Sequence, residues 1–188
     1  QEESLVKSSE GDDPVQTLRM RTEQYGYHFQ FSRNMLFVSQ PHQPYLETAL
    51  YSGVAATDWS WSALFGDYDQ DGQQDLFISN GIVRRPNNLD YIKFISNQEI
   101  QRQLNDSRLV DQQAIDMMPS GAVTNYFLKG HADLTFSDMS QQWSDGLASI
   151  TGASAVADFD QDGDLDLVAS NTNAPLSLYI NQSNTIAD

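Results

Sequence analysis

Short apolar runs separated by polar turns make up most of the chain, and this pattern predicts strands rather than helices. The runs at 76–78 and 167–169 each follow an acidic turn that contains glycine, which is typical of buried strands. Residues 25–31 alternate aromatic and polar side chains and indicate a further strand or turn. Residues 1–17 are polar and acidic, so we expect a disordered connector there.

A helical pattern is expected only in the segment 84–122. Residues 87–88 can cap a helix that begins at Leu89. An apolar stripe follows at helical spacing, formed by Leu89, Ile92, Ile95, Ile100 and Leu104. A second short helix is expected near 107–118, ending before Pro119. We interpret the segment as an insert that either shapes a partner site or decorates the edge of a sheet.

One acidic loop motif occurs twice, beginning at Asp67 and, 91 residues later, at Asp158. Aspartates occupy positions 1, 3, 5 and 9 of both copies, and position 6 is Gly72 or Gly163. Carboxylates at the first three positions converge when the chain turns tightly, and such oxygen ligands suit calcium. An EF-hand loop instead ends on a glutamate at position 12, whereas these loops end on aspartate and enter an apolar strand.

Two alternatives to calcium stay open for these loops. One is an acidic turn without metal, although two copies in register are harder to explain by chance than one. Several carboxylates in one turn also repel each other unless a cation neutralises them. The other alternative is magnesium, which prefers strict octahedral geometry and retains its waters, so it suits an all-protein site less well.

The similarity between the two halves extends beyond the loops. Residues 34–37 align with 125–128, and Asn80 aligns with Asn171, at the same offset. A third start at 178–181 gives a period of about 50 residues, and four short strands per period are typical of a β-propeller blade. We therefore expect an all-β partial propeller with blades of four antiparallel strands and a small helical insert. Its parts are a first blade unit at 18–83 with the loop 67–75, the insert at 84–122, a second blade unit at 123–176 with the loop 158–166, and the start of a following blade at 177–188.

These features resemble the FG-GAP/VCBS-repeat β-propellers, whose blades also form integrin α-subunit heads. The resemblance covers about residues 20–183 and is carried by 33–36, 56–61, 79–82 and 133–136. Within that group the chain is similar to bacterial surface proteins of the Bacteroidetes type, related to the UnbV and cartilage-acidic-protein group. Asp-rich loops of this family bind calcium on one face of the propeller. The resemblance therefore implies about two calcium ions, one held by Asp67, Asp69, Asp71, Asp75 and the Gln73 carbonyl, the other by Asp158, Asp160, Asp162, Asp166 and the Asp164 carbonyl.

Composition narrows the partners and the compartment. The chain has 188 residues, too few for a closed seven-bladed propeller, so we expect a fragment that packs against other blades of its parent protein. A net charge of −16 argues against nucleic acid and anionic membranes, which need basic surfaces. No cysteine is present, which excludes disulfides and thiol catalysis. No apolar run approaches a membrane span. Calcium modules of modest affinity suit extracellular conditions, so a secreted or cell-surface protein is expected.

No catalytic constellation is recognisable, because the sequence has no Ser-His-Asp order, phosphate-binding glycine loop or HExxH motif. We therefore expect a non-catalytic calcium-binding segment that binds a protein or a glycan at the cell surface. Two alternatives are a scaffold segment of a carbohydrate-active enzyme, similar to polysaccharide lyases, and a structural docking subunit of a surface assembly. Trp59 and Trp61 lie two apart on one strand and suit either packing between blades or stacking on a sugar.

Overall fold

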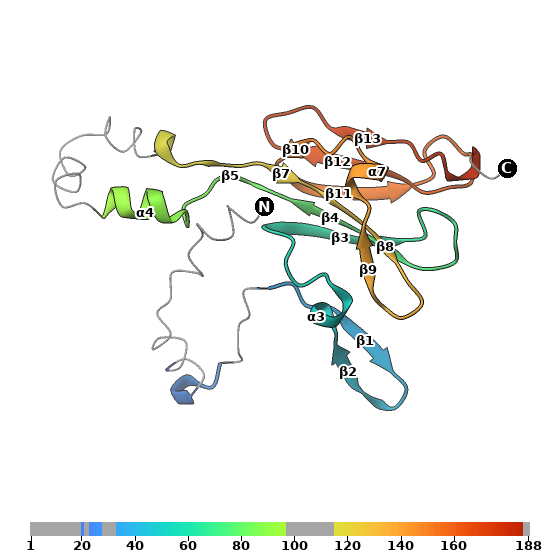
Figure 1. Ribbon diagram of the computed structural model, residues 1–188, viewed down its shortest axis with the longest axis horizontal. Coiled ribbons are helices and arrows are strands. Elements are labelled where there is room, and N and C mark those ends of the chain that lie inside the picture. The colour runs from blue at the N-terminus through green and yellow to red at the C-terminus, as the bar shows by residue number, and fades with distance from the viewer. Residues whose placement is uncertain (1–19, 21–22, 28–32, 97–114, 186–188) are drawn as a thin grey trace. The chain divides into compact units, whose positions relative to one another are not determined.

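Figure 1 shows the computed structural model of the chain. It describes residues 20, 23–27, 33–96 and 115–185, and the connector expected at 1–17 lies outside this range. The chain divides into two compact units, of which the larger comprises residues 33–83 together with those from 121 onward. No described helix has the length and apolar character needed to cross a membrane.

The larger unit is built mainly from antiparallel strands, which confirms the expected all-β class, and none of its sheets closes on itself. Two short helices and a 3-10 turn interrupt the strands. A two-stranded sheet of β5 and β6 brackets residues 85–119. The elements are β1 (Phe37–Gln40), β2 (Gln43–Glu47), α3 (Ala49–Ser52), β3 (Ser60–Gly66), β4 (Asp75–Asn80), β5 (Ile82–Arg84), β6 (Ser120–Gly121), β7 (Val123–Thr124), β8 (Tyr126–Gly130), β9 (Phe136–Asp138), α7 (Ser140–Trp143), β10 (Ala148–Ser149), β11 (Thr151–Ala157), β12 (Asp166–Asn171), β13 (Ser177–Tyr179) and η1 (Ser183–Thr185).

A four-stranded antiparallel sheet, in the order β3-β4-β8-β9, forms the centre of this unit. Leu64 pairs with Phe77, which pairs with Phe127, so these three side chains share one face of the sheet. Leu76 and Leu128 are paired in the same way on the opposite face. Both faces are therefore apolar, and each needs a covering layer.

The first face packs against a three-stranded sheet in the order β11-β12-β13. The rings of Phe77 and Phe127 meet edge to face at 4.9 Å between centroids, and the ring of Tyr179 meets Phe127 at 5.4 Å. Leu167 and Ala169 of β12 complete this buried cluster. The two antiparallel sheets thus stack through a buried aromatic and aliphatic cluster that stabilises the unit.

The opposite face is covered by α3 and the segment that follows it. Ala49 of α3 and Val54 pack against Leu76 of β4. The β1–β2 hairpin is fastened at its base by Arg33, which donates hydrogen bonds of 3.0 and 2.8 Å to the Glu47 carboxylate. These bonds from Arg33 lower the pKa of Glu47 to about 2.

The β3 end of this second face has no covering layer among the described residues. Trp61 is 58% exposed and Phe65 is 48% exposed, and both lie on the same face of the sheet as Leu76. The indole N–H of Trp61 donates a 2.7 Å hydrogen bond to the Gly81 carbonyl, so the ring is held in place although it is exposed. Within the described chain these aromatics therefore do not pack between sheets.

The boundaries of the hydrogen-bonded sheets differ from the boundaries of the sequence repeat. β3 and β4 belong to the unit expected at 18–83, whereas β8 and β9 belong to the unit expected at 123–176, and all four share one sheet. The segment 84–122 connects the second and third strands of that sheet. A four-stranded sheet is thus assembled from half of each repeat, and the sheets do not coincide with the expected blade units.

Matching side-chain bonds confirm that the two repeats are structurally equivalent. The Ser60 hydroxyl donates a 2.9 Å hydrogen bond to the Asn80 side chain. At the offset of 91 residues, the Thr151 hydroxyl donates a 2.7 Å bond to the Asn171 side chain. Each asparagine thereby ties the last residue of a central strand to the first residue of its neighbour.

The smaller unit contains the helix α4 (Leu89–Ile95), which begins where the sequence predicts. The Asn88 side chain caps it by accepting hydrogen bonds from the backbone of Asp90 at 3.1 Å and Tyr91 at 3.0 Å. The remainder of the expected apolar stripe and most of the second helix fall at 97–114, outside the described residues.

Replacing Phe77 with alanine tests whether the packing between the two sheets stabilises the unit. Phe77 is fully buried, so Phe77→Ala should lower the free energy of unfolding by about 3–5 kcal/mol through lost burial and a cavity. Phe65→Ala in the adjacent strand is the matched control and should cost much less, because Phe65 is exposed. Urea denaturation followed by circular dichroism measures both, and equal losses would contradict this assignment of the core.

Candidate metal centre

The loop between β3 and β4 curls around the side chain of its first aspartate. The two carboxylate oxygens of Asp67 accept hydrogen bonds of 3.0 Å from the backbone N–H groups of Asp71 and Gly72. Gln70 and Gly72 adopt positive φ angles of 58° and 84°, which reverse the chain within a few residues. The turn therefore presents its acidic side chains toward a common point.

The loop between β11 and β12 repeats this geometry. Asp158 accepts hydrogen bonds of 3.1 Å from the backbone of Asp162 and Gly163. The positive φ angles recur at Gln161, with 64°, and at Gly163, with 98°. Identical backbone geometry at two positions far apart in the sequence shows that the motif, rather than its surroundings, determines the conformation of the loop.

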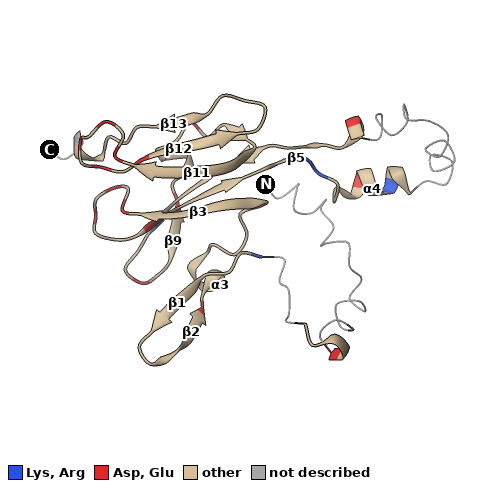
Figure 2. Ribbon diagram, turned by 180° about the vertical axis from the view of Figure 1, so that it is seen from behind, with Lys and Arg blue, Asp and Glu red and all other residues tan. Residues whose placement is uncertain are grey.

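Each loop gathers three carboxylates. Oxygens of Asp67, Asp69 and Asp71 lie within 4.8 Å of one another, and so do those of the second trio. Figure 2 shows the acidic residues concentrated in these loops, and the Gln70 side chain donates a 3.3 Å hydrogen bond to the Gly163 carbonyl of the second loop. Like charges at this spacing repel by about 1–4 kcal/mol per pair near a protein surface, so each trio favours a cation. The second trio is Asp158, Asp160 and Asp162.

Unsatisfied oxygen atoms support the fit of these loops to a metal ion. One carboxylate oxygen of Asp69 is buried without any hydrogen-bond partner, and so is one of Asp164. Buried acceptors normally find a partner, and a cation supplies one to each. In the second loop, burial raises the pKa of Asp160, and the charges of Asp162 and Asp166 raise it further. The residues present thus fit a hard cation with oxygen ligands, and whether it is calcium stays a prediction.

The aspartates at position 9, Asp75 and Asp166, brace the loops through hydrogen bonds that their carboxylates accept. Asp75 is fully buried, and its carboxylate accepts hydrogen bonds of 2.9 Å from the Tyr68 backbone and 2.8 Å from the Gly130 backbone. Asp166 accepts in the same way from Phe159 at 2.7 Å and from Asn181 at 2.7 Å. Asp75 joins its loop to β8, Asp166 joins its loop to the residues just after β13, and neither belongs to the trios above. Their role as metal ligands stays a prediction.

Position 7 differs between the loops. The sequence predicts a carbonyl ligand from Gln73 and from Asp164, with the side chains uninvolved. The Asp164 side chain is nevertheless only 2% exposed, and it accepts a 3.1 Å hydrogen bond from the Ser183 hydroxyl. The Asn184 side chain also donates a 2.8 Å bond to the Asp162 carbonyl. Ser183 and Asn184 therefore belong to the second site, and only the return of the chain at η1 brings them there.

The first loop has a lysine that sequence reasoning missed. The ammonium group of Lys129, on β8, forms salt bridges with Asp69 and, at 2.7 Å, with Asp71. These two carboxylates raise the pKa of Lys129 above its usual value, so it is charged at any physiological pH. Lys129 follows the first loop by some sixty residues, and no local pattern points to it.

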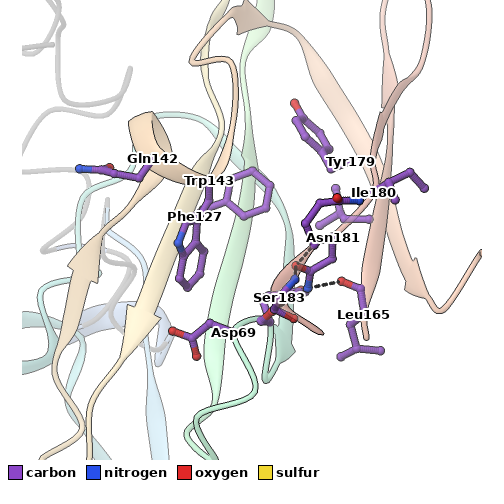
Figure 3. Close-up of a pocket in the computed structure, with 12 residues that line it drawn as sticks. Asp69, Phe127, Gln142, Trp143, Leu165, Tyr179, Ile180, Asn181 and Ser183 are labelled. Atoms are coloured by element: carbon purple, nitrogen blue, oxygen red, sulfur yellow. Dashed lines mark hydrogen bonds between the residues drawn. The ribbon is translucent and has the colours of Figure 1, made fainter. Parts of the chain in front are cut away.

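A cavity of about 400 Å³ lies beside the first loop, between β8 and β13 (Figure 3). Trp143 and Tyr179 form aromatic walls, and Asp69 and Asn181 place polar groups at its edge. Such a combination suits a ring with one apolar face and peripheral hydroxyl groups. The remaining lining residues are Tyr68, Phe127, Gln142, Leu165, Leu167, Ile180, Gln182 and Ser183.

Removing the position-9 aspartates should destabilise the protein even without metal. Asp75→Ala leaves two buried N–H groups unpaired and should lower the unfolding free energy by about 2–4 kcal/mol, measured by urea denaturation in chelator. Asp67→Ala, whose N–H partners are exposed, is the matched control and should cost less than half as much. Equal losses would contradict the assignment of Asp75 as the acceptor that holds the loop in the absence of metal.

Comparison with known proteins identifies no relative: no protein-family model matches the chain, and no curated protein or solved structure matches it significantly. The resemblance to FG-GAP/VCBS propellers therefore stays a prediction that rests on the loops and the repeat.

Proposed function

We propose that this chain is a non-catalytic, calcium-binding segment of a β-propeller in a secreted or cell-surface protein. The observation that carries the proposal is the duplicated loop. Two hairpins, β3–β4 and β11–β12, close through identical turns, and each turn gathers three carboxylates. In this role calcium holds the turn that joins two strands of a sheet and so stabilises the folded state.

Calcium is favoured over magnesium by the chemistry of the donors. All candidate ligands are oxygens, and the turns carry more acidic groups than a single octahedral ion with several waters needs. Calcium accepts variable coordination numbers, so it tolerates the difference at position 7 between Gln73 and Asp164. The modest affinity typical of short acidic loops on surface modules matches extracellular calcium and supports the proposed location.

Neighbouring blades of the same parent protein are the proposed structural partners. The β1–β2 hairpin stands as a sheet of only two strands, which is marginal by itself. In β3, Trp61 and Phe65 also leave an apolar strip uncovered. A further pair of strands beside β1 would complete a four-stranded sheet and cover this strip, just as β11 and β12 cover the opposite face.

A glycan is the proposed external ligand that the cavity favours. Trp143 and Tyr179 offer aromatic surface for a sugar ring, while Asp69 at the edge of the cavity offers a carboxylate acceptor for its hydroxyl groups. Among the described residues we see no comparable feature that favours the alternatives. These are a protein ligand, a scaffold role in a carbohydrate-active enzyme and a docking role in a surface assembly.

Calcium binding is tested by calorimetric titration of the chelator-treated chain, with thermal melts in calcium and in chelator. We expect about two ions per chain and a higher melting temperature in calcium, corresponding to about 2.7 kcal/mol at a hundredfold excess over Kd. Asp160→Ala should remove one ion. Asp145→Asn, which removes one exposed charge outside the loops, is the control and should leave both ions bound. The absence of any calcium binding would refute the proposal.

A further inference from the structure

Register pairing places Lys129 and Ile180 at equivalent positions of the two sites. Leu76 pairs with Leu128 across β4 and β8, and Leu167 pairs with Tyr179 across β12 and β13. The residue that follows in the third strand is Lys129 in the first sheet and Ile180 in the chain after β13.

The hydrogen bonds of the bracing aspartates confirm this equivalence. The N–H of Gly130 donates to Asp75 in the first site, and the N–H of Asn181 donates to Asp166 in the second. Each donor is the residue directly after the position in question. The two sites therefore share one backbone framework. At the equivalent position, however, the first site has the cationic side chain of Lys129 and the second has the aliphatic side chain of Ile180.

The charge at the two sites differs accordingly. The first loop holds four aspartates, at 67, 69, 71 and 75, and its negative charge is reduced by the Lys129 ammonium group. The second loop holds five, because Asp164 adds to the aspartates at 158, 160, 162 and 166. Among the described residues no salt bridge reaches this second group.

Both sites hold a buried carboxylate oxygen without a hydrogen-bond partner, on Asp69 in the first and on Asp164 in the second, but only the first has a cationic side chain in contact with its aspartates among the described residues. Asp164 is 2% exposed, and one of its carboxylate oxygens has no hydrogen-bond partner. The side-chain oxygen of Asn184 is also buried without a hydrogen-bond partner. In the first loop the corresponding position is Gln73, and an internal ammonium group already contacts Asp69 and Asp71.

We propose that Lys129 is a built-in counter-ion of the first loop, so that the two sites bind calcium with unequal affinity and the second loop fills first. The inference rests on the proposed calcium-binding function. A divalent ion enters the first loop only when the Lys129 ammonium group withdraws from Asp69 and Asp71, a movement that its flexible four-carbon stem allows. Affinity in such loops follows ligand charge, which also ranks the second loop higher.

The first arm of the test measures calcium affinity at the first loop alone. The double variant Asp158→Asn with Asp160→Asn silences the second loop, and calorimetry then gives the Kd of the remaining site. Lys129→Met in this background should lower that Kd about tenfold or more, because the competing charge is gone. Lys93→Met, which removes an exposed lysine on α4, is the matched control and should leave the Kd unchanged.

The second arm needs no calcium. In chelator, Lys129→Met should melt at a lower temperature than the wild type, since the first loop loses its counter-ion, and saturating calcium should restore most of the difference. Ile180→Lys should weaken calcium binding at the second loop, measured with Asp67→Asn and Asp69→Asn in place. Ile180 is 38% exposed, so the longer side chain has access to solvent.

The outcomes separate the two proposals. Equal calcium affinities of the two loops in the wild type, with no gain in Lys129→Met, would overturn the counter-ion inference and leave calcium binding intact. If no variant binds calcium at either loop, the proposed function fails, and the ranking of the sites fails with it. If the two loops of the wild type bind calcium with unequal affinities, and these affinities become similar in Lys129→Met, both the proposed function and the counter-ion inference are supported.

Discussion

Confinement of like charges in two short turns is the constraint on which this structure depends. Each turn brings three carboxylates within 4.8 Å of one another where it joins two antiparallel strands. Backbone N–H groups directed at Asp67 and Asp158 offset part of this repulsion, and the buried carboxylates of Asp75 and Asp166 fix the turn to the strand beyond. The remaining repulsion is what makes a cation useful: an ion that binds only the folded turn stabilises the whole hairpin.

The apolar faces of the central sheet impose a second requirement. Because Phe77 points to one side and Leu76 to the other, the sheet needs a layer on both sides, and the β11–β12–β13 sheet supplies only one of them completely. The four-stranded sheet takes two strands from one repeat and two from the next, so the two repeats are joined by backbone hydrogen bonds as well as by packing.

The duplicated loops are alike in backbone and unlike in electrostatics. The first loop has a lysine that offsets part of the repulsion between its carboxylates. The second loop instead has an additional buried aspartate, which increases that repulsion. In the first loop the Lys129 ammonium group partly compensates the negative charge, whereas among the described residues no salt bridge does so in the second loop. The two loops also touch, since the Gln70 side chain donates a hydrogen bond to the Gly163 carbonyl.

The sequence by itself determined the two acidic turns, their duplication, the strands around them and the helix start at Asn88, because each depends on neighbouring residues: tight turns, alternation and capping are local. The tertiary structure decided which strands share a sheet, the burial of Asp164 and the placement of Lys129. These depend on contacts between distant segments: β8 reaches β4 across the insert 84–122, and η1 returns to the second loop. Backbone pairing between strands carries no side-chain signature in either segment, so only the folded chain shows which charges meet.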